Sequence, residues 1–214
     1  MTVDDELVAE LLQPHLNLLA ASEGLVFDGS RVLTSSNSMK SLLAKITKNG
    51  IDVRFLDGTL EVNLALLTDD TLCSAANLSA LVVLPFASTS YSLPTLTDAT
   101  LLRIAQQKAP IHHFVFGSHM STGFTINGII ALVKAWQNAE VSGVCRRLFP
   151  WLEDMKIWKF GRIRSTKDEF STAFLSLPKS RIYLPTSMKY EAIALVENAL
   201  DNHFELRVTC SLMN

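Results

Sequence analysis

The alternation of apolar and polar residues on either side of Asp57-Gly58 is the strongest local constraint on how this 214-residue chain folds. Apolar side chains occupy every second position before the dipeptide and again after it: Ile51, Val53 and Phe55, then Leu60, Val62 and Leu64. A period of two is typical of a half-buried strand, and Asp-Gly readily adopts the positive φ angles of a two-residue turn. The pattern therefore predicts a β-hairpin centred on residues 57–58.

Helix-like and strand-like patterns intermix along the rest of the chain. Apolar residues at helical spacing, several after a Ser, Thr or Asp cap, predict helices over 3–20, 39–48, 69–80, 97–108, 124–138, 143–154 and 190–200. Apolar or alternating runs predict a strand pair within 25–33 and strands at 81–86, 111–116, 157–163, 181–184 and 204–212. The regular alternation of a doubly wound fold is missing, and we recognise no internal repeat. We predict an α+β fold: a mixed, mainly antiparallel sheet with amphipathic helices packed on it.

The segment Ala87–Thr95 is the best candidate for a domain boundary. Its sequence, ASTSYSLPT, has the composition of a loop. We expect an N-terminal α+β lobe over residues 1–86 and a C-terminal α+β lobe over residues 96–214. Because no stretch has the composition of a flexible linker, the alternative is one compact domain.

Composition is that of a folded protein without a membrane-spanning helix. Hydrophobic residues make up 48% of the chain and charged residues 19%, which is enough apolar material for a core. No apolar run reaches the ~18 residues that a membrane helix needs, and the acidic start lacks the features of a secretory signal. Three scattered cysteines do not make a disulfide framework or a zinc site. We expect an intracellular, cytoplasmic protein.

Charge is divided unevenly between the two halves of the chain. Residues 1–100 hold 5 Lys/Arg and 12 Asp/Glu, a balance of −7, whereas residues 101–214 hold 14 and 9, a balance of +5. Such asymmetry suggests an anionic partner for the basic half, or association between unlike surfaces of two copies. The alternative is that the charges average out over the folded surface.

The basic segment 146–189 is the main candidate for a binding surface. It holds ten Lys/Arg against four acids. We expect Lys159, Arg162, Arg164 and Lys167 to line one exposed edge and to neutralise phosphates of nucleic acid or of lipid headgroups. Trp158 and Phe160 interleave with them and would stack on bases or lie at an interface. With strict pleating, Trp158, Phe160 and Ile163 would not all share one face. The alternative is a solvated strand with buried aromatics and exposed charges.

Catalytic signatures are missing from the sequence. No phosphate-binding glycine loop, zinc-protease motif, Cys-x-x-Cys or nucleophile elbow occurs. The closest group is His112, His113 and His119, with Ser118 beside the last. Adjacent residues on a strand point to opposite faces, so these residues make neither a metal site nor a nucleophile–base pair unaided. We expect no cofactor, metal ion or small-molecule substrate, and keep a small intracellular enzyme with a site near His112–His119 as an alternative.

Residues 124–212 resemble rhabdovirus matrix proteins. An amphipathic helix contains Trp136, a Ser142-Gly143 turn follows, and Arg147 and Phe149 open a second apolar helix. Further on come Arg181-Ile182-Tyr183-Leu184-Pro185 and a last apolar strand over 205–212. Residues 1–100 have no counterpart in that family. The resemblance implies a structural virion protein without enzymatic activity that polymerises under a membrane and condenses a nucleocapsid.

Three functional hypotheses follow. The first is a non-enzymatic assembly protein, like a viral matrix protein, that forms homo-oligomers and contacts an anionic surface, either a membrane or a nucleocapsid. The second is a sequence-tolerant RNA-binding protein that uses the same basic segment. The third is the small enzyme. Self-association is expected for a chain of low charge and high apolar content, and unlike halves favour head-to-tail contacts, which give rings or open polymers.

Overall fold

The computed structural model describes residues 2–13, 24–27, 31–46, 52–55, 61–62, 66–78, 80–83, 91–107, 111, 113–141, 156–177, 180–183, 189–197 and 203–212. The described helices are α1 (Asp5–Leu11), α2 (Ser36–Ile46), α3 (Asp69–Leu72), α4 (Asp98–Ala105), α5 (Ile126–Val141) and α6 (Lys167–Leu175). The described strands are β1 (Thr2–Val3), β2 (Gly24–Phe27), β3 (Arg31–Val32), β4 (Asp52–Phe55), β5 (Glu61–Val62), β6 (Ala80–Val83), β7 (Tyr91–Thr97), β8 (His113–Gly123), β9 (Lys156–Ile163), β10 (Ser180–Tyr183), β11 (Lys189–Glu197) and β12 (His203–Leu212).

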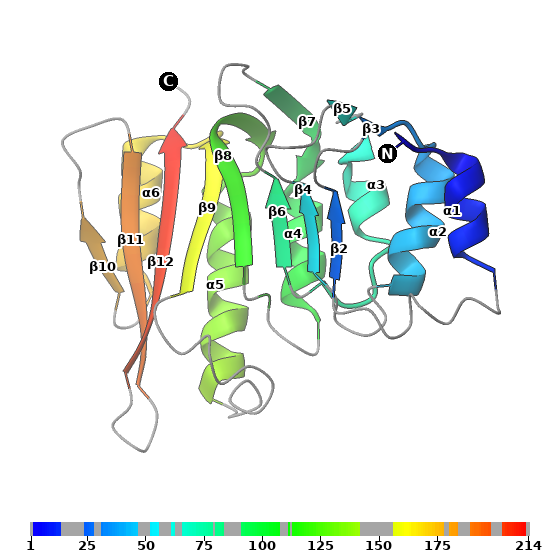
Figure 1. Ribbon diagram of the computed structural model, residues 1–214. Helices are drawn as coiled ribbons and strands as arrows, with labels where there is room; N and C mark the ends of the chain where they lie inside the picture. The colour runs from blue at the N-terminus through cyan, green and yellow to red at the C-terminus, as the bar shows by residue number, and fades with distance from the viewer. Residues whose placement is uncertain are drawn as a thin grey trace.

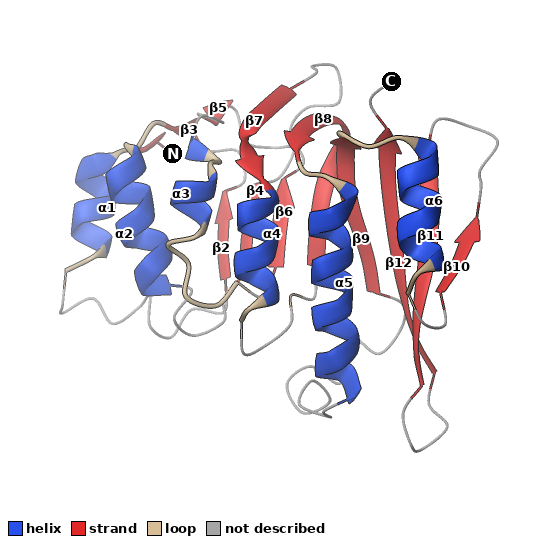
Figure 2. Ribbon diagram, turned by 180° about the vertical axis from the view of Figure 1, so that it is seen from behind, coloured by secondary structure: helices blue, strands red, loops and turns tan. Residues whose placement is uncertain are grey.

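A long, mostly parallel sheet dominates the molecule. Its strands follow the order β10-β11-β12-β9-β8-β6-β4-β2, with β7 beside β8. Every pairing from β2 to β12 is parallel, and only β12–β11 and β11–β10 are antiparallel. Figures 1 and 2 show the helices α1 to α6 on one face of this sheet and none on the other. The predicted mainly antiparallel α+β fold is therefore wrong, and the arrangement is α/β with a one-sided helix layer.

The predicted hairpin at Asp57-Gly58 is also wrong. The strand before it, β4, pairs in parallel with β2 and β6, whereas the strand after it, β5, pairs in parallel with β3. The two strands thus belong to different sheets, because β1, β3 and β5 form a small parallel sheet of their own. The two strands expected within 25–33 are divided between the same two sheets. Alternation shows that a strand is buried on one face, but it does not say which strand is its neighbour.

The chain repeats a unit of short strand, helix and sheet strand, which is a correction to the absence of repeats inferred above. β2, β4 and β6 begin at residues 24, 52 and 80, and β1, β3, β5 and β7 begin at residues 2, 31, 61 and 91. Each unit stacks on the one before it, as in solenoid proteins, so that the sheet strands β2, β4, β6, β8 and β9 lie side by side in sequence order. The repeat is hard to see in the sequence because few residue types recur at equivalent positions.

Carboxylates at the first position of several helices join consecutive units. Asp5 of α1 accepts hydrogen bonds from the Thr34 hydroxyl (2.7 Å) and the Ser35 backbone N–H (2.6 Å), just before α2. Asp98 of α4 accepts hydrogen bonds from the Thr125 N–H (2.8 Å) and hydroxyl (2.6 Å), just before α5. Each carboxylate thereby links its own helix to the cap of the following helix.

Asp69 of α3 makes the largest set of these bonds. One of its carboxylate oxygens accepts hydrogen bonds from the Thr97 N–H (2.8 Å) and from the N–H and hydroxyl of Thr100 (3.3 and 2.7 Å), and the other accepts one from the Thr97 hydroxyl. Thr97 is also the N-cap of α4. The N-terminus of α4 is therefore fixed to α3 through one side chain.

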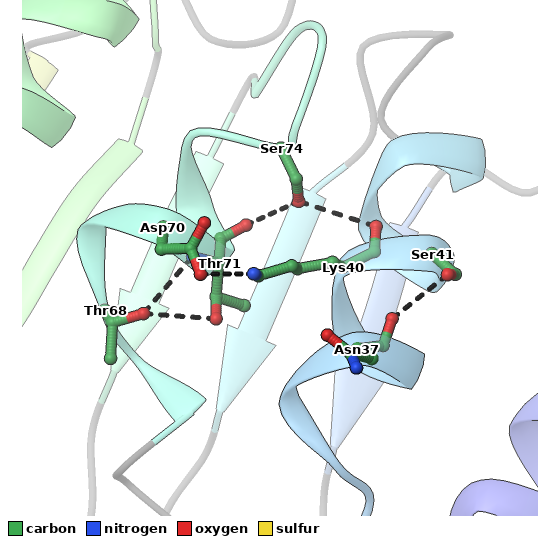
Figure 3. Close-up of polar contacts among 7 residues, drawn as sticks. All are labelled: Asn37, Lys40, Ser41, Thr68, Asp70, Thr71 and Ser74. Atoms are coloured by element: carbon green, nitrogen blue, oxygen red, sulfur yellow. Dashed lines mark hydrogen bonds and ion pairs between the residues drawn. The ribbon is translucent and has the colours of Figure 1, made fainter.

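Different contacts join α2 to α3, because Ser36 stands where α1, α3 and α4 have a carboxylate. Lys40 forms an ion pair with Asp70, and the Ser74 hydroxyl donates a hydrogen bond to the Lys40 carbonyl (3.4 Å), as Figure 3 shows. The Ser74 hydroxyl also contacts the Thr71 carbonyl of α3. These bonds replace the carboxylate link at that junction.

The core lies between the sheet and the helices, in rows that run across the strands. The register aligns Leu81, Phe114, Trp158 and Val208, each 0% exposed. The next row on this face aligns Val83, Phe116 and Phe160, which are also buried. Trp136 of α5 packs edge-on against Trp158, with ring centroids 6.4 Å apart. The face that bears these rows therefore points to the helices.

Several predicted elements differ from those observed. The expected helix over 190–200 is strand β11, and the expected loop over 87–95 contains the start of β7. Helix α6 was not expected, and the helix expected over 143–154 lies outside the described residues. One sheet passes through the expected boundary, since β6 of residues 1–86 pairs with β8 of residues 96–214.

Candidate functional site

A bulge at Gly161 shapes the exposed side of β9. The register runs evenly from Trp158 to Phe160 and then shifts, so that Arg162 pairs with Ser211 on β12 and with Ser121 on β8. Gly161 has φ +65°, a left-handed conformation that other residues rarely adopt. A Cβ atom there would lie 2.6 Å from the carbonyl oxygen of Met120. Only glycine fits this position without strain.

The bulge resets the alternation of β9 by one residue. Trp158 and Phe160 face the helices, and Ile163 returns to the same side; all three are 0% exposed. A regular strand would put residues 160 and 163 on opposite faces. Lys159, Arg162 and Arg164 alternate with these buried residues and are exposed. We call these three residues, together with the exposed Lys167, the basic row.

Lys159 lies on the helix-free face of the sheet. Its neighbours in the register are Val115 on β8 and Thr209 on β12. Because Trp158 and Phe160 on either side of it point to the helices, Lys159 points the other way, toward the face that carries no helix in Figures 1 and 2. That face leaves the ammonium group open to a partner.

The backbone at the end of β9 holds Arg164 in place. Its N–H donates a hydrogen bond to the Phe124 carbonyl (3.0 Å), and its own carbonyl accepts one from the Ser165 hydroxyl (2.7 Å). The same hydroxyl accepts a hydrogen bond from the N–H of Ile126, the first residue of α5 (2.9 Å). Ser165 is buried, so the exposed Arg164 rises from a fixed segment.

Lys167 begins α6, where a positive charge opposes the helix dipole. The helix is nevertheless well capped: the Thr166 hydroxyl accepts a hydrogen bond from the Glu169 N–H (3.2 Å), and the Glu169 carboxylate accepts one from the Thr166 N–H (2.7 Å). Among the described residues no carboxylate forms an ion pair with any member of the basic row. The four cations are therefore not explained by internal charge pairing within that part of the chain.

A polar groove of about 590 Å³ lies between α5 and α6 and meets the basic row at Arg164. Mostly polar side chains, with both signs of charge, line it together with two apolar ones: Thr125, Ile126, Asn127, Arg164, Ser165, Asp168, Glu169, Thr172, Ala173 and Ser176. Because Asp168 and Glu169 share this groove, it is less suited to an anion than the basic row.

Trp158 and Phe160 lie in the core, as the second interpretation of these residues expected. The Phe160 ring stacks on Phe114 at 4.7 Å, and Trp158 contacts the ring of Phe160 edge-on. Neither ring has an exposed face. They fix β9 against the helix layer and leave contact with a partner to the charged residues.

The histidines do not come together in a described site. His112 lies outside the described residues, and His113 begins β8, where its backbone pairs with Ala80. His119 lies in the outward bend of β8 opposite Gly161, beside Tyr91, with ring centroids 6.3 Å apart. Its Nε2 is buried and has no hydrogen-bond partner among the described residues. In the described part of the chain no three His, Cys, Asp or Glu residues are grouped to hold a metal ion.

The sequence contains one signal for the geometry of this site, which the predicted regular strand over 157–163 does not include. Gly161 interrupts the run from Trp158 to Arg164, and an isolated glycine in a strand pattern indicates a bulge. With one residue bulged out, Trp158, Phe160 and Ile163 share a face and the cations share the other. The bend of β8 over residues 117–120 carries a similar signal, because Gly117 interrupts that strand pattern in the same way.

Comparison with known proteins identifies no similar protein. No family model, no curated protein and no solved structure matches the chain. The resemblance to rhabdovirus matrix proteins stays a prediction. Within the described residues, no helix combines the length and the apolar character that crossing a bilayer requires. Arguments about function therefore rest on the fold and on the basic row.

Proposed function

We propose that this chain is a non-enzymatic assembly protein that contacts a phosphate-bearing anionic surface through the basic row. The observation that carries the proposal is the Gly161 bulge, which keeps Lys159, Arg162 and Arg164 exposed while their neighbours remain in the core. The bulge stands where a regular strand would turn Arg162 and Arg164 toward the helices and expose Ile163. Solenoids commonly use such extended faces to bind other macromolecules.

The proposed contact is electrostatic and does not read bases. Lys and Arg neutralise phosphates whatever the sequence around them, and burial of Trp158 and Phe160 leaves no stacking platform in this segment. Both a nucleocapsid and an anionic membrane present phosphates at high density. We expect binding to duplex and single-stranded nucleic acid of equal phosphate content to be similar, since stacking is what favours single strands.

Charge reversal of Arg162 and Arg164 together tests the proposal. Binding of the wild type and of the double variant is measured by flotation with vesicles containing phosphatidylserine, and by fluorescence anisotropy with single-stranded and duplex RNA. Both side chains are exposed, so circular dichroism should show an intact fold. We expect the variant to lose at least tenfold in affinity for whichever anionic surface the wild type binds.

Lys134→Glu is the matched control, because Lys134 is exposed on α5 and lies in the helix layer rather than on the basic row. It changes the net charge in the same direction and should leave binding nearly unchanged. Equal losses in the control and in the double variant would indicate a general charge effect. That result, or a wild type that binds no anionic surface at low salt, contradicts the proposal.

A further inference from the structure

The fold converts the charge asymmetry of the sequence into a charge asymmetry in space. Because consecutive units stack side by side, position along the sheet follows position along the chain from β2 to β9, as the colour gradient in Figure 1 shows. The described residues of the half with a balance of −7 thus lie at one end of the molecule, and those of the half with a balance of +5 at the other. In this arrangement the charges do not average out.

Helix α1 lies at the acidic end of the helix layer, next to α2 (Figure 2). Val8 is buried and Leu7 and Leu11 are half-buried, which fixes the inner face of the helix. The opposite face of the helix and the residue just after its end are exposed: Glu6, Ala9, Glu10 and Gln13. They form a stripe with two carboxylates, which we call the acidic stripe, and α1 contains no Lys or Arg.

The acidic stripe is not arranged for the stability of α1. Glu6 and Glu10 are four residues apart, where like charges repel across one helical turn. Glu10 also lies near the C-terminus of the helix, where the dipole disfavours an acid. Asp4 and Asp5, in contrast, have internal roles as the helix cap and the acceptor for Thr34 and Ser35. Among the described residues no cation forms an ion pair with Glu6 or Glu10.

We propose that two copies of this chain associate head to tail, with the acidic stripe of one copy against the basic row of the next. The two surfaces are of opposite charge, both are exposed, and neither is neutralised by described residues of its own copy. Because they are different surfaces, the contact is heterologous and leaves one of each free at the ends, so that assembly continues into rings or open polymers. This inference rests in part on the proposed function, since both use the same cations.

Sedimentation velocity at 50 and 500 mM salt, over a range of protein concentrations, tests the inference. We expect the wild type to associate at low salt and to dissociate at high salt, because contacts between exposed charges are screened. Glu6→Lys together with Glu10→Lys should abolish association without lowering vesicle or RNA binding, because the basic row is intact in this variant. Asp168→Lys, which raises the net charge without touching α1, should leave association intact.

Mixing two charge-reversed variants is the decisive experiment. The Glu6→Lys/Glu10→Lys variant and the Arg162→Glu/Arg164→Glu variant should each stay monomeric alone and associate when mixed, since each then offers a surface that complements the other. A wild type that is monomeric at 50 mM salt, association that survives the changes on α1, or a mixture that stays monomeric would each overturn the inference. The effect of the α1 variant on vesicle binding is measured separately, so failure of this inference is distinguishable from failure of the proposed function.

Discussion

Gly161 is the residue on which the shape of β9 depends. Its φ of +65° and the proximity of the Met120 carbonyl both exclude a larger side chain. A non-glycine residue held in a sparsely populated conformation costs on the order of 1–3 kcal/mol. A larger residue at position 161 should therefore lower the stability of the fold. It should also change which side chains of β9 are exposed.

We expect Gly161→Ala to lower the free energy of unfolding by about 1–3 kcal/mol, measured by urea denaturation. Arg162→Ala, one residue further along the same strand, is the control and should change it by less than about 0.5 kcal/mol, since that side chain is exposed. Equal stability of the glycine variant and the wild type would show that β9 accommodates the methyl group, and the bulge would then not be needed.

Asp5 makes the stability of the first junction depend on pH. Hydrogen bonds to its carboxylate, above all from the Ser35 backbone N–H and then from the Thr34 hydroxyl, lower the pKa of Asp5 to about 2. A carboxyl whose pKa is lower in the folded state stabilises that state at neutral pH and loses this effect as pH falls. The loss should take place between about pH 4, where unfolded Asp titrates, and pH 2.

Melting temperatures of the wild type and of Asp5→Asn across pH 2–7 check this expectation. The wild type should be more stable above pH ~5, where its carboxylate is charged in both states, and the difference should shrink as the pH approaches 2. A difference that stays constant over the whole range would mean that protonation of Asp5 is not linked to folding.

At the scale of the elements, the junction between α3 and α4 allows the contribution of a carboxylate link to stability to be measured, because two adjacent aspartates there differ in role. Asp69 accepts hydrogen bonds from Thr97 and from the buried Thr100, whereas Asp70 is exposed and forms an ion pair with Lys40. Removing a carboxylate that satisfies buried donors costs about 1–3 kcal/mol. An exposed ion pair is worth no more than ~1 kcal/mol.

Thermal and urea unfolding of Asp69→Ala and Asp70→Ala should therefore give unequal losses, with the larger one at residue 69. The two substitutions remove the same atoms one residue apart, so helix propensity and net charge change alike. Similar losses would show that the carboxylate links between units contribute little to stability.

Most elements could be predicted from the sequence, but their pairing could not. The periodicity around Trp136 correctly indicated an amphipathic helix, and Trp136 is 1% exposed. Segments 157–163 and 204–212 are strands as predicted, yet β9 and β12 run parallel, because alternation within a strand carries no information about direction. β11 was predicted as a helix because Tyr190, Ile193 and Val196 also fit a helical spacing.

The candidate site was predicted at the level of residue type and not of geometry. Exposure of Lys159, Arg162, Arg164 and Lys167 matches the expectation from the basic segment. The separation of these cations from Trp158 and Phe160 depends on the bulge, which forms only where β8 bends around Gly161. Gly161 indicates a bulge in the sequence, but the partner strand that bends around it is a tertiary feature, which local patterns do not contain.

For the whole molecule, the one-sided helix layer is the feature with the widest consequences. Stacked units place the acidic and basic halves at opposite ends and leave the other face of the sheet without helices, as Figures 1 and 2 show. Lys159 lies where this face and the basic half meet, and the basic row continues from it through Arg162 and Arg164 to Lys167 at the start of α6. The central claim is that these cations bind phosphate.

The salt dependence of binding to a duplex oligonucleotide tests that claim most directly. Each phosphate neutralised contributes about −0.9 to the slope of log K against log salt concentration. If Lys159, Arg162 and Arg164 each contact one phosphate, the wild-type slope should be about −2.7, and Arg162→Ala should reduce its magnitude by about 0.9. A wild-type slope near zero, or one that Arg162→Ala leaves unchanged, would contradict the account.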